Sequence, residues 1–173
     1  MKVLLVVDMQ SDFIDGSLGT PEAVGIVPKV VEKIRAWEGL VYATQDTHDE
    51  NYLQTREGQA LPVEHCMQNT SGWQIAPAVR AALGPDAVCL TKPTFGSREL
   101  AEKLLELEEP IDAIELIGLC TDICVISNAL LLKAFLPEVP ISVDAACCAG
   151  VTPESHQNAL KAMKMCQITI CNE

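Results

Sequence analysis

Short, largely apolar segments alternate along this chain with segments whose apolar residues recur at helical spacing. A continuous apolar run is typical of a strand buried on both faces, and apolar residues three or four positions apart indicate one buried face of a helix. The predicted strands are 3–7, 40–44, 87–91, 113–117, 141–143 and 168–170. The predicted helices are 26–37, 75–83, 98–108, about 123–135 and 153–165.

This alternation predicts a three-layer α/β/α fold, doubly wound around a mostly parallel six-stranded sheet. A chain of 173 residues fits one domain with a well-formed core. No repeat, low-complexity segment or linker divides it, so we expect a single domain over residues 1–173. In such sheets, ligands bind beyond the carboxyl ends of the strands, where the strand order switches.

Charge and hydropathy argue against several classes of partner. A formal net charge of −12 disfavours binding to nucleic acid or to an anionic membrane. No apolar segment has the length of a transmembrane span, and the run at 3–7 is too short for a signal peptide, so we expect a cytoplasmic protein. The eight cysteines form no Cys-x-x-Cys pair, and a chain of this size needs no disulfide framework, so reduced thiols are expected.

Polar residues follow three of the predicted strands. Asp8 ends the first apolar run, Lys92 follows the third, and Cys124 comes shortly after the fourth, in the motif G-L-C-T-D-I-C-V. Because the carboxyl ends of parallel strands meet at one edge of a sheet, we expect these three side chains to come together. Thr121 and Asp122 are expected to cap the following helix, which would place Cys124 in its first turn, where a thiolate is favoured.

Each of these residues also has a structural interpretation. Cys124 alone could pack as a small apolar side chain, and Asp8 with Lys92 could form an ion pair beneath a loop. An aspartate that ends an apolar strand, however, lies in a poorly solvated place, where functional pKa shifts arise.

In order and placement, the three motifs resemble those of the isochorismatase-like cysteine hydrolases and, within them, the nicotinamidases. The segments concerned are V-V-D-M-Q at Asp8, T-K-P-T-F-G-S at Lys92 and G-L-C-T-D-I-C-V at Cys124. The resemblance runs from the first strand to the last helix. It implies an isochorismatase-like fold and hydrolysis of a small amide through a thioester on Cys124.

The resemblance also implies the roles of individual groups. Asp8 would shuttle the proton, and Lys92 would stabilise the thiolate and tune Asp8. The backbone N–H groups of Cys120 and Cys124 would form the oxyanion hole, with a cis peptide bond before Cys120.

A long irregular segment is predicted from Gln45 to about Gly72, and loops of that length are usually functional. It contains Asp46-Thr47-His48 and, later, His65, an arrangement similar to the metal ligands of nicotinamidases. We therefore expect Asp46, His48 and His65 to bind one divalent metal ion, zinc first, with iron or manganese as alternatives. The alternative for either histidine alone is a hydrogen-bonding loop residue. The third histidine, His156, is expected to face solvent.

The resemblance implies nicotinamide as the substrate, converted to nicotinate and ammonia. Phe13 and Tyr52 are loop aromatics that could sandwich a flat ring, or pack the loops instead. Trp73 stands where many nicotinamidases have a small residue, so another carbamoyl or ureido amide stays open as the substrate. A third interpretation is a metal- or redox-responsive binding protein, since fold does not fix function. The sequence leaves open whether the chain forms a homo-oligomer.

Overall fold

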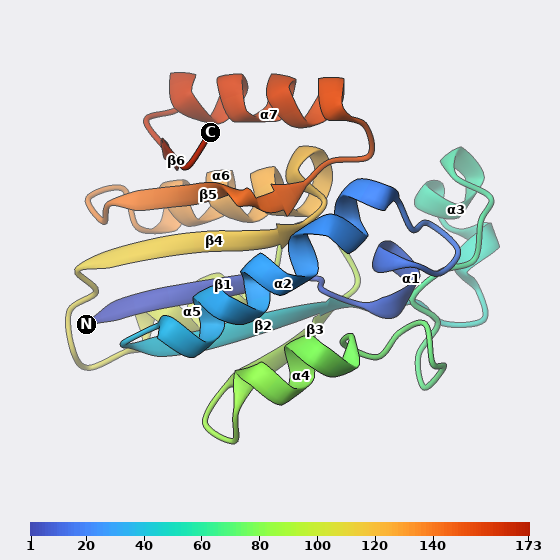
Figure 1. Ribbon diagram of the computed structural model, residues 1–173, viewed down its shortest axis with the longest axis horizontal. Helices are drawn as coiled ribbons and strands as arrows, with labels where there is room; N and C mark the ends of the chain where they lie inside the picture. Colours follow the sequence, from blue (N-terminus) through green and yellow to red (C-terminus); the bar gives the residue numbers. More distant parts are fainter.

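The computed structural model describes residues 1–173 and shows helices on both faces of a central sheet (Figure 1). All six strands are parallel, in the order β3-β2-β1-β4-β5-β6. They are β1 Lys2–Val7, β2 Leu40–Asp46, β3 Val88–Lys92, β4 Ala113–Leu119, β5 Ile141–Ala149 and β6 Thr169–Cys171. The predicted three-layer fold is confirmed, and the sheet is wholly rather than mostly parallel.

Seven α-helices and two shorter turns connect the strands. The helices are α1 Ser11–Ile14, α2 Pro21–Ala36, α3 Arg56–Ala60, α4 Pro77–Leu83, α5 Arg98–Leu105, α6 Ile126–Phe135 and α7 Pro153–Met165. The turns are the 3-10 turn η1, Tyr52–Gln54, and the π-helical turn η2, Thr121–Val125. None of the helices combines the length and the apolar character needed to cross a bilayer.

The side chains of β1 show how the sheet is buried. Val3, Leu5 and Val7 belong to the core beneath α5, α6 and α7. Leu4 and Val6 point the other way, into the core beneath α1, α2 and α4. All five side chains are inaccessible or nearly so. The continuous apolar run is therefore the consequence of two-sided coverage, as in other parallel sheets.

Several predicted boundaries were wrong; β5, for example, runs six residues beyond its predicted end, to Ala149. Two further differences have local reasons. Helix α2 begins five residues earlier than expected, at Pro21, because the Thr20 side chain accepts a hydrogen bond from the N–H of Ala23 at 3.0 Å and caps it. The segment predicted as irregular from Gln45 is partly ordered, since β2 extends to Asp46 and is followed by η1 and α3. Helical pieces of three and five residues are too short to show an apolar period in the sequence.

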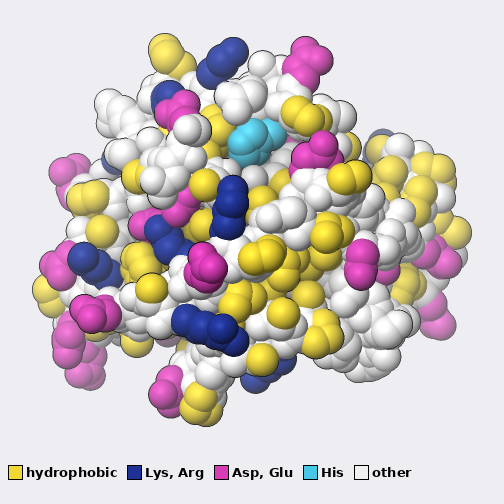
Figure 2. Space-filling view, viewed as in Figure 1, with side chains coloured by type: hydrophobic (Ala, Val, Ile, Leu, Met, Phe, Trp, Pro, Cys, Tyr) yellow, Lys and Arg dark blue, Asp and Glu magenta, His cyan; other side chains and the backbone are white.

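The strand order fixes where a ligand can enter. The chain builds β1, β2 and β3 outward in one direction and then returns to place β4 on the other side of β1. The connections after β1 and β4 therefore diverge to opposite faces and open a crevice at the carboxyl ends. Helices α1 and α3 lie at this end of the sheet (Figure 1). On the face viewed in Figure 2, Lys and Arg side chains are interspersed with Asp and Glu, and no wholly basic surface appears there.

Candidate active site and metal centre

The ammonium group of Lys92 lies at the centre of the crevice. Its Nζ atom is 2.7 Å from Oδ2 of Asp8, 3.2 Å from Oδ1 of Asp46 and 3.4 Å from Sγ of Cys124. Lys92 is 2% exposed and Asp8 is wholly buried, so these charges are compensated by one another and not by water. The structure thus brings the three residues expected to be catalytic together and joins to them one expected metal ligand.

Asp8 is held in an unusual conformation at the end of β1. Its φ of +47° lies in the left-handed region, which non-glycine residues seldom adopt and which is enriched at functional sites. Oγ1 of Thr44, on the neighbouring strand, donates a hydrogen bond to Oδ1 of Asp8 at 2.7 Å. Burial raises the pKa of Asp8, although Lys92 opposes the shift. A carboxyl group in this state is suited to accept and return a proton.

The Cys124 thiol lies in η2, before α6 begins at Ile126. The carbonyl of Cys120 accepts hydrogen bonds from Ile123 at 3.1 Å and from Val125 at 3.0 Å, and the second of these is the i to i+5 bond of a π-helical turn. Burial raises the pKa of Cys124 well above its ordinary value, Asp8 adds to the shift, and Lys92 opposes it. Burial and Asp8 thus favour the neutral thiol, Lys92 favours the thiolate, and the expected preference for a thiolate stays a prediction.

Thr121 and Asp122 do not cap the helix as predicted. Oγ1 of Thr121 is hydrogen-bonded to Nδ1 of His156 at 2.8 Å. The Asp122 carboxylate accepts from the N–H of Val151 at 3.1 and 3.2 Å. Both residues instead tie η2 to the start of α7. His156 is accordingly half-buried against Thr121, and the expectation that it faces solvent is corrected.

The backbone N–H group of Cys120 is unpaired. The Leu119–Cys120 peptide bond is cis. The N–H group of Cys120 donates to no acceptor within the protein, and both Cys120 and Cys124 line the cavity described below. The oxyanion hole of Cys120 and Cys124 stays a prediction, for which the unpaired donor in the cavity wall is physical support.

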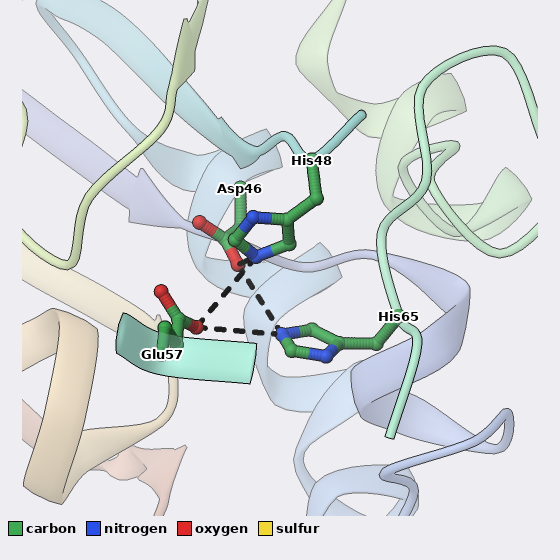
Figure 3. Close-up of side chains that lie close together, drawn as sticks. All are labelled: Asp46, His48, Glu57 and His65. Carbon is green, nitrogen blue, oxygen red and sulfur yellow. Dashed lines mark hydrogen bonds and ion pairs between the residues drawn. The ribbon is translucent and has the colours of Figure 1, made fainter. Parts of the chain in front are cut away.

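Four side chains converge in Figure 3: Asp46 at the end of β2, His48 just after it, Glu57 in α3 and His65 in the connection after α3. Oδ2 of Asp46 is 3.0 Å from Nε2 of His48 and 3.6 Å from Nε2 of His65. Oε1 of Glu57 is 3.6 and 3.8 Å from the same two nitrogen atoms. Ligand atoms about 2.1 Å from one ion lie roughly 3.4 Å apart in tetrahedral and roughly 3.0 Å apart in octahedral geometry, and only the second leaves positions open beside four protein donors. This donor set therefore fits a divalent ion with room for a further ligand.

Neighbouring groups orient these ligand atoms. Nδ1 of His65 is 2.8 Å from the carbonyl of Val63, to which it donates, so Nε2 is left free to bind a metal. The buried Gln10 amide pairs with the backbone of Asp46, donating to its carbonyl at 2.8 Å and accepting from its N–H at 2.7 Å. Burial would raise the pKa of Asp46, but hydrogen bonds to His48 and His65 and the charge of Lys92 hold it well below the usual range.

Glu57 and Gln10 were missed at the sequence level. Glu57 belongs to a five-residue helix inside a segment predicted as irregular. The one sequence signal that could have identified it as a ligand was its position, as an acidic residue, between the two histidines. Gln10 adjoins the Asp8 motif, but a glutamine that pairs with backbone groups has no sequence signature.

A cavity of about 750 Å³ lies between the candidate metal-binding cluster, which consists of Asp46, His48, Glu57 and His65, and the Cys124 thiol. Asp46, Glu57 and His65 line it, as do Cys120 and Cys124, so a substrate inside it can reach both groups. Its remaining walls are mostly apolar: Phe13, Leu18, Arg56, Ala60, Leu61, Pro93, Thr94, Phe95, Ile123 and Val151.

Of the two aromatic residues predicted to contact the substrate, Phe13 and Tyr52, the structure places only the first in the cavity wall. Phe13 lines the cavity. Tyr52 does not: it is 1% exposed, its hydroxyl donates to the carbonyl of Leu61 at 2.8 Å, and its ring centroid is 4.6 Å from that of His48. Tyr52 therefore packs behind the histidines. Trp73 also lies outside the cavity lining, with its indole N–H donating to Thr47 at 2.8 Å, so its bulk does not narrow the cavity.

The chain is similar over its whole length to known hydrolases. The isochorismatase domain family matches residues 2–173. The pyrazinamidase of Pyrococcus horikoshii, crystallised in complex with zinc, is 32% identical, with 99% of each chain covered and a TM-score of 0.84. The nicotinamidase/pyrazinamidase of Bacillus subtilis is 24% identical, with 99% of each chain covered and a TM-score of 0.83. Comparison with curated proteins gave no significant match.

We expect Glu57→Gln and His65→Ala to weaken zinc binding by at least roughly 100-fold, since the first removes the charge of a ligand carboxylate, the second removes a donor atom, and even supporting groups cost 10- to 100-fold. Zinc affinity is measured by competition with a chromogenic chelator. His156→Ala is the matched control, because His156 lies outside the cluster, and it should retain the wild-type affinity. Equal affinity in all three variants would show that the metal is held elsewhere.

Proposed function

Because this chain belongs to the isochorismatase family, we propose that it is an amidase that hydrolyses a small aromatic carboxamide, nicotinamide first, to the carboxylate and ammonia. The observation that carries the proposal is the Lys92 ammonium, which contacts the Cys124 thiol, Asp8 and a member of the metal-binding cluster at one cavity. Solved structures named as nicotinamidases or pyrazinamidases, at 22–32% identity, give further support.

In the first half of the reaction, Sγ of Cys124 attacks the carbonyl carbon of the amide while Asp8 accepts the thiol proton. The oxygen of the tetrahedral intermediate faces the N–H groups of Cys120 and Cys124. The carbon–nitrogen bond then breaks, and the leaving nitrogen takes the proton from Asp8. Ammonia departs, and the acyl group stays on Cys124 as a thioester.

In the second half, a water molecule attacks the thioester carbon and Asp8 accepts its proton. The carbon–sulfur bond breaks to give the carboxylic acid, and the thiolate of Cys124 recovers a proton from Asp8. The acid leaves as the carboxylate after losing its own proton to solvent. Burial would lower the pKa of Lys92, but Asp8, Cys124 and Asp46 raise it, so Lys92 remains an ammonium throughout. It stabilises the negative charge as that charge moves between Asp8 and sulfur.

Asp46, His48, Glu57 and His65 would hold the divalent ion, zinc first, with iron or manganese as alternatives. When bound, the ion would coordinate a ring nitrogen of the substrate and so orient the carboxamide toward Cys124. Phe13, in the cavity wall, would contact the ring. This placement favours an aromatic carboxamide over a ureido compound, which has no ring nitrogen to coordinate.

Burial makes four of the seven other thiols poorly suited to a redox-responsive role. Burial raises the pKa of Cys120 to about 12 and that of Cys147 to about 11, and it also raises the pKa of Cys66 and Cys148. Oxidation proceeds through the thiolate, which these groups form sparingly at neutral pH. Unlike them, Cys124 has a carboxylate and an ammonium beside it.

We expect Cys124→Ala to lower ammonia release from nicotinamide by about 10³-fold or more, because the variant lacks the nucleophile. Cys166→Ala removes an exposed thiol far from the cavity and should leave the rate unchanged. Release is followed by a coupled ammonia assay with added zinc. Wild-type turnover by Cys124→Ala would rule out the covalent mechanism, and a wild-type enzyme that hydrolysed ureido amides but not nicotinamide would refute the proposed substrate.

The pH dependence of kcat/KM should reflect the ionisation of the Asp8 carboxyl group. Its pKa is raised, so it takes up a proton at higher pH than an ordinary aspartate, whose pKa is about 4. Since the reaction needs the carboxylate, activity is present above this raised pKa and is lost as the pH falls through it. We expect the acid limb of kcat/KM, measured with excess zinc, to lie above pH 4, and Asp8→Asn to be inactive at every pH. An acid limb at or below pH 4 would contradict this role.

A further inference from the structure

The two segments that carry Lys92 and Cys124 are not joined by the sheet. Lys92 ends β3 and Cys124 follows β4, and both β2 and β1 lie between these strands. Ladder hydrogen bonds link adjacent strands only, so none connects the two segments directly. Their 3.4 Å contact therefore depends on whatever holds the β3–α5 connection against η2 and α6.

A buried amide makes that connection. Asn128 lies in the first turn of α6 and has no exposed surface. Its Nδ2 donates to the carbonyl of Cys124 at 2.8 Å and to the carbonyl of Phe95 at 3.2 Å, and its Oδ1 accepts from the N–H of Ser97 at 2.9 Å. Both the donor and the acceptor end of the amide are thus used, on two different segments of the site.

The rest of the connection packs closely on α6. A Cβ atom on Gly96 would lie 3.4 Å from the carbonyl oxygen of Ser127 and from a methyl group of Leu131, so the backbone of the connection approaches the helix directly. The buried Ser97 caps α5, with Oγ accepting from the N–H of Leu100 at 3.2 Å. The Asn128 amide therefore holds the start of α5 at Ser97 and, at Phe95, the connection that follows Lys92.

We propose that Asn128 is a positioning residue that fixes the Lys92 ammonium relative to the Cys124 thiol. The inference rests on the proposed function, because it assigns a purpose to that contact. Asn128 does not line the cavity and so acts through the two catalytic residues instead of touching substrate. Displacements on the order of 1 Å between catalytic groups can cost about 100-fold in rate, so three hydrogen bonds at this point have kinetic consequences.

The test compares Asn128→Ala with Leu132→Ala. Leu132 is buried one turn further along α6, so its truncation destabilises the same helix without touching the amide. We expect Asn128→Ala to lower kcat by roughly 10- to 100-fold with KM little changed, and to slow alkylation of Cys124 by iodoacetamide to a similar degree. Folded Leu132→Ala should keep wild-type kcat and alkylation. Circular dichroism at the assay temperature verifies that each variant is folded.

A second variant covers the case in which Asn128→Ala does not fold. Asn128→Ser keeps a hydroxyl that can form part of the network, and we expect its kcat and its alkylation rate to fall while KM holds. A folded Asn128→Ala or Asn128→Ser with the kinetics of Leu132→Ala would overturn the inference.

Alkylation needs no amide substrate, so the two proposals can fail separately. A wild-type protein that hydrolyses nicotinamide through Cys124, together with Asn128 variants of unchanged kinetics, would refute the positioning role alone. A wild-type protein that hydrolyses no amide, and whose Cys124 is alkylated no faster than its other thiols, would refute the proposed function and this inference with it.

Discussion

The buried ammonium of Lys92 is the interaction on which the site depends. Moving a charge out of water costs several kcal/mol, and Lys92 can occupy its place only because Asp8 and Asp46 surround it. Conversely, without Lys92 these carboxylates would be buried without their cation. The thiol of Cys124 shares the same ammonium. The proposed catalytic residues and the candidate metal-binding cluster are therefore one electrostatic unit, and a change at either end alters the other.

Uncharged side chains from neighbouring elements hold this unit together. Thr44 binds Asp8 from the adjacent strand, and Gln10 pairs with the backbone of Asp46. Asn128 links the connection after Lys92 to η2 across two intervening strands. Such buried amides and hydroxyls are fully paired, so they add rigidity without adding charge to a region that already holds three ionised groups.

The sequence predicted the elements that form a regular apolar pattern and the polar residues that stand at the end of such a pattern. Apolar runs marked the strands, and Asp8 and Lys92 stood out because each ends such a run. Glu57 could not be predicted, since its helix is too short to be periodic. Nor could the raised thiol pKa of Cys124, which depends on burial beside a carboxylate from a distant strand. Tyr52 was misplaced because an aromatic residue in a loop does not reveal which side it packs against.

The most direct test of a thioester on Cys124 is partitioning by hydroxylamine. Hydroxylamine competes with water for an acyl-enzyme and yields a hydroxamate. Nicotinamide and methyl nicotinate differ only in the leaving group, so they should form the same intermediate. The account predicts one ratio of hydroxamate to nicotinate from both substrates, and no hydroxamate with Cys124→Ala. Ratios that differed between the two substrates, or hydroxamate formed by Cys124→Ala at the wild-type rate, would contradict it.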